Sequence, residues 1–395
     1  MGRRLFFGWI LGVILYSTSI IFAVTDNYIL YDKSQLQTLK TTGQFLPLHQ
    51  SKASILKRAD ALLRSPTVSV TQKKVLPPSG NPHDYVSASI YSWPDPNKPG
   101  GLPYINRDGH VNPETADGTR YDRVRLHTMT DAVRWLALAY YLSGKDVYAI
   151  KAAAFINTWF VHPTTRMTPH LTYGQGKPGI TTGSPSGMIE TVRLVYIIDA
   201  MRLLEGSTAL TPQDRDRVTA WFKDYTYWAL SSTFGHAQGS ARNNIGTWYD
   251  AQVAIYAHFT GQDDIALQIL ENAPLKRIKA QIEPDGQMPR EYVRTKSQQY
   301  SAYNLKAFIT LARLGDQLSV NIWDYQSRDG RSLVKALDYL SHTVSGDRKW
   351  PKEDLATLAD YDFAIYLYLA NTHYQSALYD RAIRTIFAKP RGPKR

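Results

Sequence analysis

The sequence contains no cysteine among its 395 residues. Disulfide bonds, thiolate nucleophiles, iron–sulfur clusters and cysteine-based zinc sites are therefore excluded. Acidic residues are also scarce relative to basic ones, 34 against 46, which gives a formal net charge of +12. Charged residues make up 20% and hydrophobic residues 43% of the chain, the composition of a globular protein of one large domain or two ordinary ones.

The sequence also lacks a His-x-x-x-His pair and an Asp-x-Asp-x-Asp-Gly loop, so we predict no metal site and no cofactor. Part of the positive charge lies at the two ends, in Arg3, Arg4, Lys389, Arg391, Lys394 and Arg395. The remaining excess is modest and suits a polyanionic substrate. No nucleic-acid motif accompanies it, so we do not expect a nucleic-acid partner.

A single long apolar run occurs in the chain, from Leu5 to Ala23, after Arg3 and Arg4. This pattern predicts a secretory signal peptide or an uncleaved signal-anchor over residues 1–23. Ile21 occupies a place where signal peptidases favour small residues, and the run is close to the length that spans a membrane. Cleavage and membrane anchoring therefore both stay open, and we expect an exported protein, either periplasmic or secreted.

The body of the chain, residues 24–387, reads mainly as helices, and residues 388–395 read as a solvated basic tail. Apolar residues at helical spacing, with caps and stop signals, predict helices over residues 127–143, 147–160, 189–204, from 212 onward, 249–260, 299–314, 335–345, 355–369 and 374–387.

Four of these helices are predicted to stop at glycines, Gly144, Gly206, Gly261 and Gly315. The intervals between them, 62, 55 and 54 residues, fit one helical hairpin plus its return loop. Stacked hairpins form either an open solenoid or a closed ring. Because long loops between hairpins crowd one face and build a cleft, we predict an all-α fold, an (α/α) toroid in the form of an incomplete barrel.

Residues 66–125 break this pattern, because prolines and glycines recur throughout the segment. A loop of this length in a compact chain is usually functional or disordered. Aromatic residues such as Tyr85 and Trp93 argue against disorder. We therefore predict a lid over a cleft, in which these two rings either stack on a bound ligand or fix the lid.

Three stretches carry a family resemblance. Residues 83–109 contain His-Asp-Tyr-Val-Ser and Tyr-Ser-Trp-Pro-Asp-Pro, residues 243–250 read Asn-Asn-Ile-Gly-Thr-Trp-Tyr-Asp, and residues 285–300 contain Asp-Gly-Gln-Met-Pro. A weaker block lies at 169–171 and 187–191. In this order, over residues 80–315, the stretches resemble the alginate lyase superfamily.

The resemblance implies an α/α toroid that cleaves a uronic-acid polysaccharide by β-elimination. It implies that Asn244 binds the uronate carboxylate, that Arg294 helps to neutralise it, and that Tyr300 is the proton donor and often also the base. The sequence departs from the family pattern at one position, where Ile245 stands in place of a histidine.

Further residues of these stretches are candidates for binding substrate, each with a structural alternative. Asn243 could simply form a turn, and Trp248 more readily holds a helix start than contacts sugar. His83 lies beside a proline and could be structural. The full set is Asn243, Tyr85, Trp93, His83, His170, Tyr173, Arg290 and Trp248.

β-Elimination removes the C5 proton of a uronate and expels the oxygen on C4, so it needs charge stabilisation on the carboxylate, a base and an acid. Asn244 and Arg294 offer hydrogen-bond donors. Tyr300 can act as the base only if positive charge lowers its pKa, and Arg294 and Lys296 lie close enough in the sequence to do so.

Because Ile245 cannot transfer a proton, a single tyrosine would have to serve both steps unless another group replaces the histidine. In mannuronate and glucuronate the C5 proton and the C4 oxygen lie on the same face of the ring, whereas in guluronate they lie on opposite faces. We therefore predict a lyase acting on β-1,4-linked, mannuronate-rich alginate or glucuronan, with guluronate disfavoured. Another histidine, such as His83, His170 or His236, could replace the missing one.

Two other functions stay open. Loss of the motif histidine could leave a weak or inactive uronan-binding protein of the cell envelope. A glycoside hydrolase on the same fold would need two carboxylic acids flanking the cleft. Glu190, Asp250, Asp285 and Glu291 are candidates, but no two of them form a recognisable pair in the sequence.

Overall fold

The computed structural model describes residues 28–355, 358 and 360–389. The predicted signal peptide or anchor, residues 1–23, lies outside the described residues, as do residues 390–395 of the predicted basic tail. Within the described part of the chain, no helix combines the length and the apolar character needed to cross a membrane.

Helices dominate the structure. The α-helices are α1 (Lys33–Thr42), α2 (Lys52–Leu63), α3 (Arg123–Ser143), α4 (Asp146–Ile156), α5 (Val195–Leu203), α6 (Pro212–Ser231), α7 (Thr233–Gly239), α8 (Asn244–Phe259), α9 (Asp263–Ala273), α10 (Lys279–Gln281), α11 (Pro289–Tyr292), α12 (Ser297–Leu318), α13 (Leu333–Ser345), α14 (Tyr361–Tyr374) and α15 (Ala377–Ala388). Tighter or wider turns are η1 (Leu46–Leu48), η2 (Val70–Gln72), η3 (Pro99–Gly101), η4 (Pro113–Ala116), η5 (Asn157–Val161), η6 (Pro185–Leu194) and η7 (Pro274–Ile278).

The strands form three two-stranded pairs and no larger sheet among the residues that the structure describes. An antiparallel pair joins β1 (Gln44–Phe45) to β2 (Gln50–Ser51), and another joins β4 (Ser92–Trp93) to β5 (Ile105–Asn106). A parallel pair joins β3 (Val86–Ala88) to β6 (Tyr173–Gly176), and so connects the segment before α3 to the one after α4.

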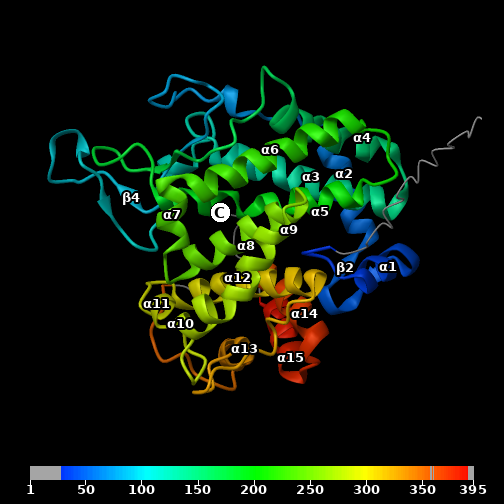
Figure 1. Ribbon diagram of the computed structural model, residues 1–395, viewed down its shortest axis with the longest axis vertical. Helices are drawn as coiled ribbons and strands as arrows, with labels where there is room; N and C mark the ends of the chain where they lie inside the picture. The colour runs from blue at the N-terminus through cyan, green and yellow to red at the C-terminus, as the bar shows by residue number, and fades with distance from the viewer. Residues whose placement is uncertain (1–27, 356–357, 359, 390–395) are drawn as a thin grey trace, which may run out of the picture.

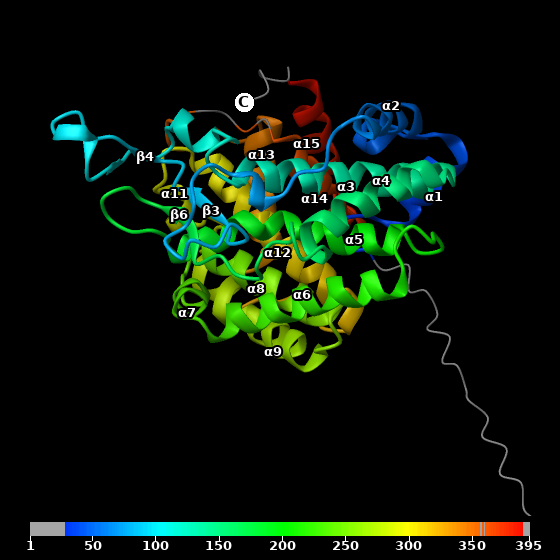
Figure 2. The same ribbon diagram turned by 90° about the horizontal axis from the view of Figure 1, so that it is seen from above.

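The helices are arranged as an inner and an outer layer (Figure 1, Figure 2). In the inner layer α3, α5, α8, α12 and α14 pack one against the next. Outer helices cover them, with α4 on α3, α6 and α9 on α8, α13 on α12 and α15 on α14. This arrangement confirms the predicted all-α fold, an incomplete (α/α) toroid.

The N-terminal part of the described chain bridges the two ends of the inner layer. η1 contacts α14 and α15, while α1 contacts α3. The backbone N–H groups of Ile29 and Leu30 donate to the buried carboxylate of Asp199, at 2.9 and 2.7 Å. The first described residues are thereby fixed to α5.

The predicted stop signals are correct at three glycines and wrong at the fourth. Gly144, Gly206 and Gly261 have positive φ angles of 69°, 85° and 74°, which favour glycine. Gly315 instead lies inside α12, which continues to Leu318. A Cβ atom at Gly315 would lie 2.3 Å from the carbonyl oxygen of Val320, so this glycine permits a close approach of the chain.

The predicted helix over residues 189–204 is also corrected. Its first half belongs to η6, a 3₁₀ turn that begins at Pro185, and only Val195–Leu203 is α-helical. The helix predicted from residue 355 begins at Tyr361, after Asp360 as its cap. Thr211 caps α6 as predicted, through a hydrogen bond from the backbone N–H of Asp214.

Helix α8 is buried nearly all round and forms the centre of the fold, between α9 and α12. Most residues of the Asn-Asn-Ile-Gly-Thr-Trp-Tyr-Asp run at its start have an architectural role. A Cβ atom at Gly246 would lie 2.0 Å from the carbonyl oxygen of Ala241, so only glycine fits there. The Trp248 indole donates to the carbonyl of Tyr303 at 3.0 Å, and the Tyr249 hydroxyl to that of Ala229 at 2.9 Å.

A buried ion pair holds the turn before α8 in place. The Arg277 guanidinium, 1% exposed, donates from Nε and Nη2 to the two carboxylate oxygens of Asp250, at 2.7 and 2.9 Å. It also donates to the carbonyl oxygens of Gly239 and Ala241, at 2.8 and 2.5 Å. Asp250 is therefore committed to structure and cannot serve as the acid of a hydrolase.

We expect Asp250→Ala to destabilise the fold by about 3–5 kcal/mol, because it leaves a buried guanidinium without its partner. Chemical denaturation of the purified protein measures this loss. The matched control is Asp263→Ala, which removes an exposed pair with His258 and should cost less than about 1 kcal/mol. An unchanged denaturation midpoint for Asp250→Ala would contradict the assignment.

Candidate active site

A cavity of about 430 Å³ lies between the lid segment and the inner helices. The lid contributes Tyr91, α3 contributes Arg123 and His127, and η6 contributes Glu190 and Arg193. The remaining wall, near α8 and α12, contains residues of the sequence motifs at 243–250 and 285–300. The full lining is Ser89, Ile90, Tyr91, Arg123, His127, Gln175, Lys177, Ser186, Ile189, Glu190, Val192, Arg193, Asn244, Ile245, Arg294, Tyr300 and Tyr303. We call this cavity the cleft.

The structure brings Asn244, Arg294 and Tyr300 together in the cleft, as the sequence predicts. Asn244 is the first residue of α8, after Asn243, whose side chain caps the helix by accepting from the N–H of Ile245. Asn243 is thus a capping residue and does not line the cleft. Ile245, at the position where the resemblance predicts a histidine, contributes an apolar surface to the cleft.

A buried carboxylate fixes the position of Asn244. Glu291, 1% exposed, accepts the backbone N–H of Asn244 at 2.6 Å and its side-chain Nδ2 at 2.7 Å. Because a carboxylate only accepts, this contact determines which end of the amide faces Glu291 and leaves a second N–H of Nδ2 free. Burial raises the pKa of Glu291 to about 7, although the N–H groups of Asn244 oppose the rise.

A lid carboxylate fixes Arg294. Asp108 accepts from Nε and Nη2 of Arg294, and also from the backbone N–H and the hydroxyl of Thr295 at 3.1 and 2.9 Å. Burial opposes ionisation of Asp108, but these hydrogen bonds outweigh it and lower its pKa to about 2. The guanidinium also stacks on Tyr300, with 3.7 Å between its central carbon and the ring centre.

Tyr300 faces the lid. Its hydroxyl donates to the hydroxyl of Tyr91 at 2.9 Å. Burial, and then the neighbouring Tyr91, raise the pKa of Tyr300 well above 10, although Arg294 opposes the rise. The expected lowering of this pKa by Arg294 and Lys296 is therefore wrong for the free protein, since the effect of burial is larger. Tyr300 holds its proton in the resting site.

Tyr300 separates the cleft from a second cavity of about 440 Å³. This second cavity shares Tyr91, Tyr300 and Tyr303 with the cleft and adds Gln299 and Asp360. The two cavities therefore meet at these three tyrosines.

Basic side chains dominate the charge of the cleft. Arg294 is paired with Asp108, and Arg193 with Asp131. Arg123 and Lys177 have no ion-pair partner among the residues that the structure describes. The acidic residue of the lining, Glu190, is buried, and burial raises its pKa. The cleft therefore favours an anionic ligand.

Sequence reasoning missed His127, Arg123 and Arg193, which lie far from the three motifs in the chain. Arg123 and His127 are one helical turn apart on α3, and this spacing is the signal that could have placed both on one face. Burial, followed by Arg193 and Arg123, lowers the pKa of His127 to about 3, so its ring is neutral.

Two predicted substrate contacts are corrected because their side chains are buried. Tyr85 is 0% exposed, and its hydroxyl donates to Glu190 at 2.5 Å, so the ring is not available to stack on sugar. Trp248 is 2% exposed beneath Tyr303 and holds the start of α8.

The other predicted contacts lie outside the cleft lining. Trp93 donates to the carbonyl of His110 and lies under Arg107, within the lid hairpin. His170 pairs with Asp84 at 3.2 Å and lies beside Tyr173. His83 contacts the carbonyl of Arg166 and lines a different cavity, and Arg290 is exposed on α11.

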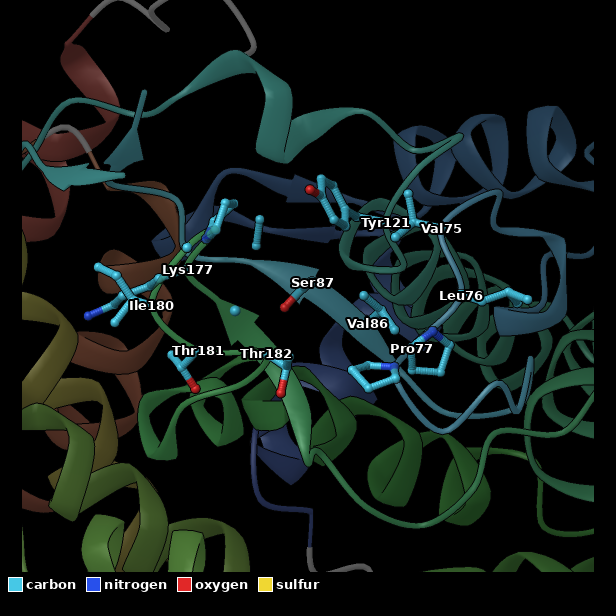
Figure 3. Close-up of a pocket in the computed structure, with 15 residues that line it drawn as sticks. Val75, Leu76, Pro77, Val86, Ser87, Tyr121, Lys177, Ile180, Thr181 and Thr182 are labelled. Carbon is cyan, nitrogen blue, oxygen red and sulfur yellow. The ribbon is translucent and has the colours of Figure 1, made fainter. Parts of the chain in front are cut away.

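None of the three histidines considered as replacements, His83, His170 or His236, is part of the cleft lining. A further cavity lies beside the β3–β6 pair, where Leu76, Pro77 and Ile180 give it apolar walls (Figure 3). Because Asn244, Arg294 and Tyr300 are absent from its lining, it is distinct from the cleft.

A family model and a solved structure both relate this chain to alginate lyases. A family model described as alginate lyase matches residues 69–350. The crystal structure of an alginate lyase from Bacteroides ovatus is similar over 92% of this chain and 96% of that chain, with 36% sequence identity and a TM-score of 0.86. No curated protein matches the sequence.

Structures of alginate lyase A1-III variants are more distant. An apo form covers 88% of each chain, with 16% identity and a TM-score of 0.54. A complex with a tetrasaccharide covers 91% of this chain and 95% of that chain, with 14% identity and a TM-score of 0.56. At this identity the likeness concerns the fold alone.

We expect Asp108→Asn to destabilise the protein by about 2 kcal/mol at neutral pH, because a pKa lowered from 3.8 to about 2 favours the folded state. This contribution is present above about pH 4 and is lost as the pH falls through about 2. Denaturation of wild type and variant across this range measures it. A difference that does not shrink with acid would show that Asp108 stabilises by other means.

Proposed function

The chain belongs to the alginate lyase family and is a polysaccharide lyase, and we propose that it cleaves β-1,4-linked, mannuronate-rich alginate or glucuronan by β-elimination. The observation that carries this proposal is that Asn244, Arg294 and Tyr300, from two separate motifs, line one cleft with an excess of basic side chains. An anionic polysaccharide suits both the family and this charge.

In this proposal Asn244 and Arg294 bind the carboxylate of the reacting uronate. The free N–H of the Asn244 amide, fixed by Glu291, donates to one carboxylate oxygen. Arg294 contributes positive charge next to Tyr300. Both stabilise the negative charge that develops on the carboxylate when the C5 proton leaves, and a preorganised donor is effective because it need not reorient during the reaction.

Tyr300 is the proton donor in this proposal. Its raised pKa means that the free site holds the proton that the leaving C4 oxygen requires. For Tyr300 to act as the base as well, as the sequence predicts for mannuronate, the bound substrate must displace Tyr91 and bring the phenol closer to Arg294.

Arg123, Arg193 and Lys177 are placed to bind the carboxylates of neighbouring uronates along the polymer. Two of them lack an ion-pair partner within the described chain, so their charge is available to a ligand. We also propose that the protein is exported, on the basis of the apolar run over residues 5–23 that follows Arg3 and Arg4.

One observation favours a second candidate, a uronan-binding protein without catalysis. Ile245 contributes an apolar surface to the cleft, at the position where the resemblance implies a proton-transferring histidine. In this alternative the cleft would bind oligouronates through its basic residues but would not produce an unsaturated end.

We expect wild-type protein to release an unsaturated product from polymannuronate or glucuronan, detected by its ultraviolet absorbance. Tyr300→Phe removes the proton donor and should lower the rate at least about 100-fold. Tyr227→Phe on α6, where the ring is 72% exposed, is the matched control. Binding without product in the wild type would favour the non-catalytic alternative, and full activity of Tyr300→Phe would contradict the assignment.

We expect Glu291→Gln to lower kcat by about 10-fold or more, because an amide can accept only one of the two N–H groups of Asn244. In the wild type the ionised carboxylate forms as the pH rises through about 7, so activity should rise across that range. The variant should lose this rise.

Glu271→Gln, which changes an exposed residue on α9, is the matched control and should leave both kcat and the pH profile unchanged. An unchanged pH profile in Glu291→Gln would refute the positioning role.

A further inference from the structure

A cavity of about 500 Å³ lies outside the cleft, between the end of α7 and the segment formed by η7 and α10. Its lining contains three exposed basic side chains, Arg242, Lys276 and Lys279, and a buried one, Arg277. It shares no lining residue with the cleft. We call this cavity the basic pocket.

Positive charge in the basic pocket exceeds what its neighbours neutralise. The carboxylate of Asp250 accepts from Arg277 at 2.7 and 2.9 Å and lies 3.1 Å from the ammonium of Lys276. The side chains of Arg242 and Lys279 form no hydrogen bond or ion pair within the part of the chain that the structure describes. Four positive charges thus meet one negative charge, and the surplus lies on exposed side chains that an anionic ligand can reach.

Small residues keep the basic pocket open between these side chains. Arg277 donates to the carbonyl oxygen of Gly239 at 2.8 Å, which fixes the end of α7 against η7. Position 239 favours glycine, because a Cβ atom there would lie 2.9 Å from the ring of Tyr249. Ser240 and Ala280 are further small residues of the lining. The pocket is therefore a fixed feature of the backbone, with its cations around an open space.

One turn, residues 240–244, contributes to both the basic pocket and the cleft. Arg242 lines the pocket, and Asn244, two residues later, lines the cleft. Two residues of chain span at most about 7 Å, so the backbones of Arg242 and Asn244 are at least that close. Helix α7, which leads into this turn, lies at the same end of the molecule as the lid strand β4 (Figure 1, Figure 2). A polymer that leaves the cleft over Asn244 therefore has only a short way to the basic pocket.

We propose that the basic pocket is a second binding site for a uronan, where Arg242, Lys276 and Lys279 hold carboxylates of the polymer that lie outside the cleft. The inference rests on the proposed function, because a uronan carries one carboxylate on every sugar and so presents a row of charges to such a site. Leu275 of the lining, 61% exposed, offers an aliphatic surface to the apolar face of a sugar ring.

The length of the polymer decides how much the basic pocket contributes. Each exposed ion pair is weak on its own. When one part of a chain is held in the cleft, however, another part of the same chain meets the pocket at a high local concentration, and the overall affinity rises by about 100-fold or more. An oligouronate that ends within the cleft gains nothing. The advantage of long chains should shrink as salt screens the exposed charges.

The test uses a double variant, Arg242→Gln with Lys279→Gln, which leaves the contacts of Asp250 intact. Calorimetry measures the binding of long-chain polymannuronate and of a mannuronate tetrasaccharide in the Tyr300→Phe background. We expect the double variant to raise the Kd for the polymer at least about 10-fold and to leave the Kd for the tetrasaccharide within about two-fold. With Tyr300 present, KM for the polymer should rise while kcat and the denaturation midpoint stay unchanged.

The matched control combines Arg166→Gln with Arg217→Gln, because it removes the same charge from exposed arginines that line a different cavity. This control should keep its polymer affinity within about two-fold of wild type. Inorganic phosphate is the probe for a simple anion site. Phosphate binding that the double variant abolishes, together with an unchanged polymer affinity, would show a site for small anions and overturn the inference.

Three further results would also overturn it. These are an unchanged polymer affinity in the double variant, an equal weakening of polymer and tetrasaccharide, and an equal weakening of polymer binding by the control variant. The proposed lyase activity stands or fails separately, because the binding measurement needs no cleavage. A protein that releases no unsaturated product but binds long chains through the basic pocket would refute the activity and keep this site.

Discussion

The proposed carboxylate site depends on the hydrogen bonds from Asn244 to the buried carboxylate of Glu291, because they fix both the first turn of α8 and the orientation of one amide. The Asp250–Arg277 pair and the close approach at Gly246 hold the same turn from its other side. A carboxylate bound by Asn244 would thus meet a rigid donor, on a helix that is buried nearly all round. The lid meets this site through Asp108 and Arg294.

Burial sets the protonation state of two titratable side chains that line the cleft. Burial raises the pKa of Tyr300 and lowers that of His127, so the first keeps its proton and the second lacks one. Neighbouring arginines lower the pKa of His127 further, in the same direction as burial. At Tyr300 the neighbouring arginine lowers the pKa and so opposes burial.

The sequence was sufficient to predict the ring of helices and to group Asn244, Arg294 and Tyr300, which line one cleft, because short motifs and glycine stops are local signals. It failed where a residue's role depends on distant contacts. Tyr85 looked like a sugar contact in an aromatic-rich lid, but the β3–β6 pair places it in the core. Gly315 looked like a helix stop, but its role is the close approach of Val320. His127 lies about half the chain away from Tyr300, and no local pattern links them.

The central claim, that the cleft binds a uronate carboxylate through Asn244 and Arg294, is tested most directly by a crystal structure of Tyr300→Phe with a bound oligouronate. The account predicts a carboxylate within hydrogen-bond distance of Asn244 Nδ2 and Arg294, with the C4 oxygen of that sugar next to position 300. An oligosaccharide bound in the cavity beside the β3–β6 pair, or with its carboxylates turned away from Asn244, would contradict it.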